Sequence, residues 1–342
     1  MRCTRALAAT AAVVCLGAGL AACTPTPDGP PVAVLFPGGA DDDWGASAAV
    51  LRDELADDGY AVEVRFAGDD IPRQLEQLKE VLGTEPAAVV IAPVDATSIA
   101  AVIADAPASV SVIAYDTLVT GSVRVDYFAT FDHREAGRMQ AWALVDGIAA
   151  RVATEADGAT PPAVELLAGS TDDRGAQEAF AGALEVLQPL LDAGELAVPS
   201  GRVAFEQAAI LRGDPATAAE RVAALLDDGT ELAGVLSPSD AMTAAVAAEL
   251  ADRGAASVVL TGGGSTLDGV RAVRDRAQGS TVYEDPRELA RSVADMVRQI
   301  VAGSAPTVTD DVTTDNGIRD VPTRLLPPRL VSSPAEAREL LG

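Results

Sequence analysis

Residues 32–66 read VAVLFPGGADDDWGASAAVLRDELADDGYAVEVRF and contain one complete strand–helix–strand unit. The runs Val32–Phe36 and Ala61–Phe66 are short and rich in valine, which is typical of strands buried on both faces of a parallel sheet. Between them, Gly45–Asp58 places apolar residues three and four apart and leaves acidic residues on the opposite face, as in an amphipathic helix. The stretch therefore predicts a parallel sheet covered by helices.

The same alternation of apolar runs and helix-spaced segments continues through most of the chain. Because parallel strands are joined by right-handed crossovers, this order predicts an α/β fold. The pattern favours two similar lobes, from about Val32 to Asp116 and from about Asp126 to Thr261, over one large sheet. Further strands are expected at Ala87–Ala92, Val110–Ala114, Ala163–Leu167, Leu232–Leu236, Ser257–Thr261 and Thr281–Tyr283, and further helices at Ile71–Leu82, Thr97–Asp105, Met139–Ile148, Glu178–Leu191, Pro215–Leu226, Asp240–Arg253, Thr266–Ala277, Arg287–Ala302 and Pro334–Leu341.

The charge and the composition exclude several classes of protein. The 342 residues suffice for about two domains, and 51 acidic against 25 basic residues give a net charge of −26. Nucleic acids and anionic membrane surfaces need a basic partner face, so neither is expected to bind this chain. Hydrophobic residues make up 49% of the sequence and the acidic residues are dispersed among them, which indicates a folded protein.

His133 is the only histidine of the sequence, and we expect it to be an exposed residue in the first turn of a helix. A metal site with several histidine ligands is therefore excluded. A Ser-His-Asp or Cys-His catalytic site would have to use this one histidine. We predict no metal and no cofactor.

The N-terminus has the features of an export signal. Residues 1–22 combine two arginines with a run of small apolar residues too short for a typical membrane span. They end in LAAC at 20–23, which resembles a bacterial lipobox in which Cys23 carries the lipid; an ordinary signal peptide is the alternative. Loss of residues 1–22 removes two arginines and no acidic residue, so the mature charge is −28, and residues 23–31 form a Pro-rich linker.

Polar residues follow almost every predicted strand. Ligands bind beyond the carboxyl ends of the strands in open α/β sheets, so these residues are site candidates. Trp44, between Asp43 and Gly45 at the first strand-to-helix turn, is suited to lie over a ligand face. Ser239 could equally be a helix N-cap, and the glycines at 262–264 are only a weak phosphate signal. Trp142 lies within a helix-spaced segment and is expected in the core.

Three longer stretches resemble one family. They are AYD at 114–116 with VDYFATFD at 125–132, GSTDD at 169–173, and DNGIRDVPTRLL at 315–326. Together they are similar to the xylose-type and multiple-monosaccharide-binding proteins, which are receptors of ABC sugar importers. The likeness extends over about residues 32–331.

This resemblance implies a type I binding-protein fold, in which two Rossmann-like lobes are joined by three hinge crossings and a ligand is held in the cleft. The crossings are expected near residues 116–125, 262–265 and 305–316. The N-terminal lobe would then comprise residues 32–116 plus 264–305, and the C-terminal lobe would comprise residues 117–263 plus 306–342.

The resemblance also implies which residues bind the ligand, and this chain departs from the family at several of them. Asp43, Thr117 and Glu284 stand where basic residues are usual in the family, and Arg174 stands where an asparagine is usual. The family usually has an aromatic residue directly before the position of Asp214, and this chain has Gly213 there. The ligand-binding residues expected on this basis are Asp43, Trp44, Asp116, Thr117, Asp173, Arg174, Ser239, Asp240, Gly264 and Glu284.

The sequence therefore predicts a lipid-anchored extracytoplasmic solute-binding protein that captures a sugar or a related small polar solute and delivers it to an ABC permease. The loss of basic residues leaves three ligand hypotheses open: a neutral pentose or hexose, a cationic solute such as an amino sugar, or a receptor that no longer binds tightly. Two other functions also stay open. One is a sensory receptor that feeds a membrane kinase, and the other is a glycoside hydrolase that uses paired carboxylates such as Asp172 and Asp173.

Overall fold

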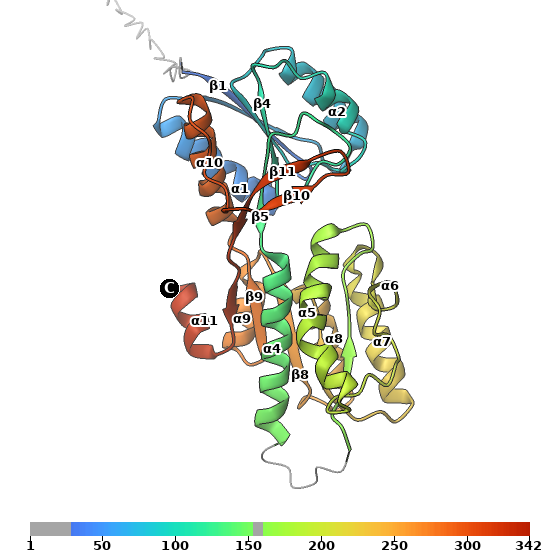
Figure 1. Cartoon of the computed structure of the whole chain (residues 1–342). Coiled ribbons are helices and arrows are strands. Elements are labelled where there is room, and N and C mark those ends of the chain that lie inside the picture. Colours follow the sequence, from blue (N-terminus) through green and yellow to red (C-terminus); the bar gives the residue numbers. More distant parts are fainter. Residues whose placement is uncertain (1–28, 153–159) are drawn as a thin grey trace, which may run out of the picture.

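The chain forms two α/β lobes, one above the other in Figure 1. This computed structural model describes residues 29–152 and 160–342. The predicted export signal and Cys23 lie outside the described residues. Among the described ones, no helix has both the length and the apolar character that a bilayer span requires.

The upper lobe is built on a seven-stranded sheet in the order β10-β11-β5-β4-β3-β1-β2. All neighbours are parallel except β10 and β11. Alternate residues of β1 enter two separate cores, so that Val34 faces α1 and α10 and Leu35 faces α2 and α3. The elements are β1 (Pro31–Phe36), α1 (Asp43–Asp57), β2 (Ala61–Phe66), α2 (Ile71–Leu82), β3 (Ala88–Ile91), α3 (Ala100–Ala104), β4 (Ser111–Tyr115), β5 (Tyr127–Phe131), α10 (Pro286–Val301), β10 (Thr313–Asp315) and β11 (Asp320–Leu326).

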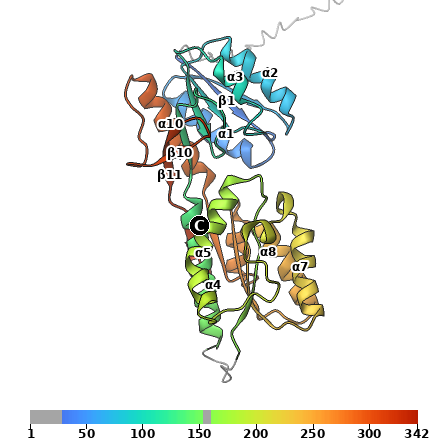
Figure 2. The ribbon, with the colours of Figure 1, turned by 45° about the vertical axis from the view of Figure 1, so that its right-hand side comes forward.

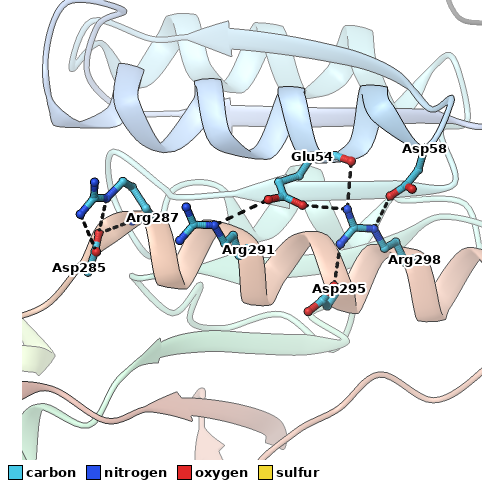
Figure 3. A network of polar contacts seen from close by, with 7 residues as sticks. All are labelled: Glu54, Asp58, Asp285, Arg287, Arg291, Asp295 and Arg298. Atoms are coloured by element: carbon cyan, nitrogen blue, oxygen red, sulfur yellow. Dashed lines mark hydrogen bonds and ion pairs between the residues drawn. The ribbon is translucent and has the colours of Figure 1, made fainter.

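Helix α10 belongs to this lobe although most of the lower lobe separates it from α1 in the sequence. Its apolar face, with Leu289 and Val293, is buried in the core that α1 shares. Figure 3 shows the polar edge of the same contact, where Arg298 donates to the Glu54 carbonyl at 2.9 Å and pairs with the Glu54 carboxylate at 3.0 Å and with Asp58. Single exposed ion pairs contribute little, so the apolar burial carries most of this contact.

The lower lobe contains a five-stranded sheet in the order β12-β9-β8-β7-β6. Helices α4 and α5 lie side by side over one face of the sheet (Figure 1), and α7 and α8 cover the other face (Figure 2). The elements are α4 (His133–Val152), β6 (Ala163–Leu166), α5 (Arg174–Asp192), α6 (Phe205–Ala208), a 3₁₀ turn (Leu211–Gly213), α7 (Pro215–Asp227), β7 (Leu232–Leu236), α8 (Asp240–Asp252), β8 (Val259–Gly264), α9 (Leu267–Arg274), β9 (Ser280–Tyr283), β12 (Arg329–Val331) and α11 (Pro334–Leu341).

Three crossings connect the lobes in the described part of the chain. The first lies between β5 and α4 at Asp132, the second between β9 and α10 at Glu284–Asp285, and the third between β11 and β12 at Pro327–Pro328. The predicted α/β fold class with two parallel-sheet lobes is thus confirmed, but the crossings lie elsewhere than predicted.

The predicted lobe bounds are wrong at three places. Residues 117–131 return to the upper sheet, because β5 pairs with β4, so the loop 116–126 is not a crossing. Residues 264–283 stay in the lower lobe, because β9 pairs with β8. Residues 306–326 belong to the upper lobe, because β11 pairs with β5. The lobe to which a strand belongs is determined by the strand with which it forms hydrogen bonds. The sequence of one strand does not indicate which strand that is.

One helix near the C-terminus and one tryptophan of α4 bear on two further expectations. The C-terminal helix was expected at Pro334–Leu341, and α11 has these bounds. Trp142 was expected in the core, but the residue is 54% exposed. An apolar residue at helical spacing therefore did not identify a buried position here.

Candidate functional site

The carboxyl ends of both sheets meet where the chain crosses between the lobes. β5 leads into the lower lobe, so its carboxyl end lies at this place, and β1, β3 and β4 run parallel to it. β9 leads into the upper lobe, and β6, β7 and β8 run parallel to it. We call this region the lobe boundary. It is where open α/β sheets bind ligands, and the predicted site residues follow strands that end there.

On the upper side, an aromatic cluster lies at the ends of β1 and β4. The Trp44 ring is 5.2 Å from that of Phe36 and meets the Tyr115 ring edge-on at 6.3 Å between centroids. The turn is fixed by Asp42, which accepts from the Trp44 amide at 2.9 Å as the N-cap of α1. Asp43 follows as the first residue of the helix and is exposed.

Asp116 forms a constrained turn at the end of β4. Its φ of 62° lies in the left-handed region, which costs an Asp about 1 kcal/mol. Its amide donates to the Ala129 carbonyl at 2.8 Å, which holds the turn against β5. Burial, with repulsion from Glu284 and Asp173, raises the pKa of the Asp116 carboxyl to about 6, although the charge of His133 opposes this shift. Thr117 beside it is exposed.

His133 connects the first crossing with the second. Its Nδ1 is 3.1 Å from Glu284 Oε1, and its Nε2 is 3.2 Å from Thr130 Oγ1. Burial alone would lower the pKa of His133, but the bond to Glu284 and the charges of Glu284, Asp116 and Asp173 together raise it to about 9. The prediction of an exposed His133 is wrong, since its side chain is 24% exposed and lies among these groups.

On the lower side, α5 begins at the lobe boundary. Asp173 caps the helix by accepting from the Ala176 amide at 3.2 Å. A Cβ on Gly175 would be 2.9 Å from the His133 ring, so the first turn of α5 lies directly against that ring. Arg174 donates from Nη1 to the Asp315 carbonyl at 2.9 Å, and thereby links the lower lobe to β10 of the upper one.

Asp240 lies behind the strand ends, inside the lower lobe. Its carboxylate accepts from Gln278 at 2.8 Å and from Thr281 at 2.9 Å, and the residue is 9% exposed. Burial raises its pKa, and these two hydrogen bonds oppose the shift. A Cβ on Gly269 would be 2.0 Å from this carboxylate, so glycine is required where α9 passes over it.

Ser239 and Gly264 complete the predicted set. Ser239 is the N-cap of α8, the alternative that its position after β7 had left open. Gly264 ends β8, and its carbonyl accepts from the Glu284 amide at 3.0 Å. Both residues therefore fix the backbone beside the lobe boundary.

The family is decided by comparison with known proteins. The sequence profile of the periplasmic binding protein domain matches residues 32–305, most of the chain. The chain belongs to the periplasmic binding protein family. Its two parallel-sheet lobes have the type I fold of this family, as the sequence resemblance implied.

Several sugar-binding proteins are similar to this periplasmic binding protein over most of their length. The multiple sugar-binding periplasmic receptor ChvE of Rhizobium radiobacter is 35% identical over 306 residues, which cover 87% of this chain and 85% of the receptor. The D-xylose-binding periplasmic protein of Escherichia coli is 26% identical and covers 79% of this chain and 77% of its own length.

A solved structure gives the same picture of the fold. The ABC transporter solute-binding protein of Clostridium phytofermentans, determined with bound β-D-glucose, superposes with a TM-score of 0.77 at 31% identity. The superposition covers 91% of this chain and 96% of that protein.

The structure brings together one part of the predicted site. Asp116, Asp173 and Glu284 lie around the His133 ring, and Trp44 packs near Tyr115, the residue before Asp116. Asp240 is held inside the lower lobe by its own partners. Ligand contact stays a prediction for every residue of the set.

Sequence reasoning missed His133, Thr130 and Tyr115. The signal for His133 was present, since the chain's single histidine directly follows the stretch that resembles the sugar-binding family. His133 lies beside the first crossing, at Asp132. The sequence had predicted that crossing near residues 116–125, so it did not indicate that His133 would lie at the lobe boundary.

Proposed function

We propose that this chain is an extracytoplasmic sugar receptor of an ABC importer, which captures a small neutral sugar between its lobes and presents the closed form to the permease. The observation that carries this proposal is the likeness over nearly the whole chain to ChvE and to the glucose-bound Clostridium phytofermentans protein. The meeting of both sets of strand ends at the lobe boundary supports it independently.

In this proposal the receptor performs no chemistry on its ligand. Binding energy shifts an equilibrium between open and closed arrangements, because a ligand held between two lobes contacts both of them only when they are closed. The three crossings would serve as the hinge, since each is a connection of one or two residues between elements, where a change in backbone angles can be absorbed.

The residues at the lobe boundary suit a sugar in type and in placement. Trp44 would lie over a face of the pyranose ring, because the ring's C–H groups pack on aromatic surfaces. Asp116 and Asp173, one from each lobe, would accept hydrogen bonds from sugar hydroxyls as the lobes close. Asp43 and Thr117, both exposed, would lie at the edge of the site.

We assign four of the remaining predicted residues a supporting part. Ser239, Asp240 and Gly264 would hold the strand ends in place, because each is already engaged by the protein itself. Arg174 would steady the approach of the lobes through Asp315 rather than donate to the sugar.

Attachment to the membrane through lipid on Cys23 completes the proposal. The segment LAAC at 20–23 supports it, and the linker 23–31 would hold the lobes off the surface. Replacing Cys23 by Ser is expected to release the protein from the membrane fraction of producing cells. Retention of the Cys23→Ser protein with the membranes would contradict the lipid anchor.

A thermal-shift screen tests the sugar-binding function. The purified protein would be heated with pentoses, hexoses, amino sugars and polyamines, each at saturating concentration. A ligand at about a hundredfold over its Kd stabilises the folded state by roughly 2.7 kcal/mol, which raises the melting temperature clearly. Stabilisation by D-glucose or D-xylose supports the proposal, and stabilisation by polyamines alone would overturn it.

A further inference from the structure

A chain of hydrogen bonds passes through His133 from one crossing to the other. Glu284, at the second crossing, faces His133 Nδ1 at 3.1 Å, and Thr130 of β5 faces Nε2 at 3.2 Å. Thr130 in turn donates its hydroxyl proton to the Asp116 carbonyl at 3.1 Å. Thr130 is 4% exposed, so its bonds are made within the protein.

These contacts favour a doubly protonated ring. The Thr130 hydroxyl has one proton and donates it to the Asp116 carbonyl at 3.1 Å, which leaves the Thr130 oxygen able to accept from Nε2. The Glu284 carboxylate can only accept, so Nδ1 also donates. An imidazole that donates from both nitrogens is an imidazolium, and the raised pKa of His133, about 9, agrees with this geometry.

Three acidic groups act on the ring, and they come from three different elements. Glu284 lies at the end of β9, Asp116 at the end of β4, and Asp173 at the start of α5. Asp116 belongs to the upper lobe and Asp173 to the lower one, so closure of the lobes would bring two carboxylates toward one another. A cation between them lowers the repulsion that closure would otherwise create.

We propose, on the basis of the sugar-receptor function above, that His133 is the positioning residue of the site: its imidazolium holds Glu284 and balances Asp116 and Asp173, so that the closed form accepts a neutral sugar. Without this cation the same carboxylates are unbalanced and favour a cationic ligand. The acid-rich lobe boundary therefore supplies its own counter-ion and does not require one from the ligand.

The protonation of the ring can be measured without any ligand. His133 is the only histidine of the sequence, so a histidine-labelled sample gives a single imidazole in a long-range nitrogen–proton NMR spectrum. We expect the imidazolium pattern at about pH 7.5, where a free histidine with a pKa near 6.5 is mostly neutral. A neutral ring at that pH would overturn the proposal, whether or not any sugar binds.

The effect on the ligand is tested with His133→Gln, which keeps a polar side chain but removes the charge. We expect its affinity for D-glucose to fall about tenfold at neutral pH, and the ratio of D-glucosamine to D-glucose affinity to rise. Arg138→Gln is the matched control, because it removes a cation from the same helix whose partners are Glu135 and Glu185. The control is expected to bind as the unmodified protein does.

The outcomes separate this proposal from the proposed function. If the unmodified protein binds no sugar, the receptor function is wrong, and the NMR spectrum still decides the state of His133. If it binds D-glucose and His133→Gln binds equally well with the same preference, the role of His133 is wrong and the receptor function stands. A fold check by circular dichroism, together with an unchanged melting temperature, ensures that a loss of affinity in the variant is not a loss of structure.

Discussion

Asp240 and Glu284 each follow a strand of the lower sheet, β7 and β9, yet their carboxylates have opposite surroundings. Asp240 is buried and accepts from the neutral groups of Gln278 and Thr281. Glu284 lies at the second crossing and faces the His133 ring. The comparison shows that an acid after a strand can lie either inside its lobe or at the lobe boundary. We expect an acid of the first kind to affect mainly the stability of the fold and one of the second kind to affect mainly ligand binding.

The largest effect is expected where the backbone touches the buried acid. Gly269→Ala would place a Cβ 2.0 Å from the Asp240 carboxylate, which Gln278 and Thr281 hold in place by hydrogen bonds. We expect the free energy of unfolding to fall by about 3 kcal/mol, as for an overpacked core. Urea denaturation measures this, with the exposed Arg271→Ala on the same helix as control. Equal stability of Gly269→Ala and Arg271→Ala would show that the Asp240 side chain can move aside to make room for the added methyl group.

Removing the buried acid itself is expected to have a somewhat smaller effect. Asp240→Ala leaves the donors of Gln278 and Thr281 without their partner but also relieves the burial of a charge, so the net loss is about 2 kcal/mol. Asp240→Asn keeps the volume and one acceptor, and should lose much less. If Asp240→Ala were as stable as the unmodified protein but unable to bind sugar, Asp240 would belong to the lobe boundary instead.

Some features of this molecule follow from local sequence patterns, and others depend on residues far apart in the chain. The α/β class and the bounds of helices such as Ile71–Leu82 follow from local periodicity, and the structure has them. The strand ends as site positions follow from the fold class and stay a prediction. Which strand ends face the boundary depends on the crossings, and those depend on the pairing of β5 and β11. The burial of Asp240 depends on Gln278 and Thr281, about forty residues away, so no local pattern could reveal it.

A smaller effect of opposite sign is expected at the lobe boundary. The pKa of Asp116 is raised to about 6 in the folded state, above its ordinary value of 3.8, so the charged form is unfavourable in the fold. This penalty is absent below about pH 3.8, grows as the pH rises to about 6 and is complete above it.

Asp116→Asn should therefore raise the stability by about 1 kcal/mol at about pH 8 and leave it unchanged at about pH 3.5. Thermal unfolding at the two pH values measures the difference, and D-glucose affinity should fall in the same variant. A loss of stability at the higher pH would show that Asp116 is held by His133 more strongly than burial opposes it.

The smallest effect is expected for the contact between Arg174 and Asp315. This hydrogen bond is exposed and single, so its loss in Arg174→Gln should change sugar affinity by no more than about threefold. Isothermal titration measures this. A loss of a hundredfold or more would mean that Arg174 contacts the sugar, as the sequence had predicted.

The affinity of the unmodified protein for D-glucose, measured by isothermal titration from about pH 7 to about pH 10, tests the central claim most directly. Because the pKa of His133 is raised to about 9, the ring keeps its charge at neutral pH and loses it as the pH passes that value. We expect the affinity to be constant up to about pH 8 and to fall about tenfold by about pH 10. An affinity that stays level across this range, or rises, would contradict the account.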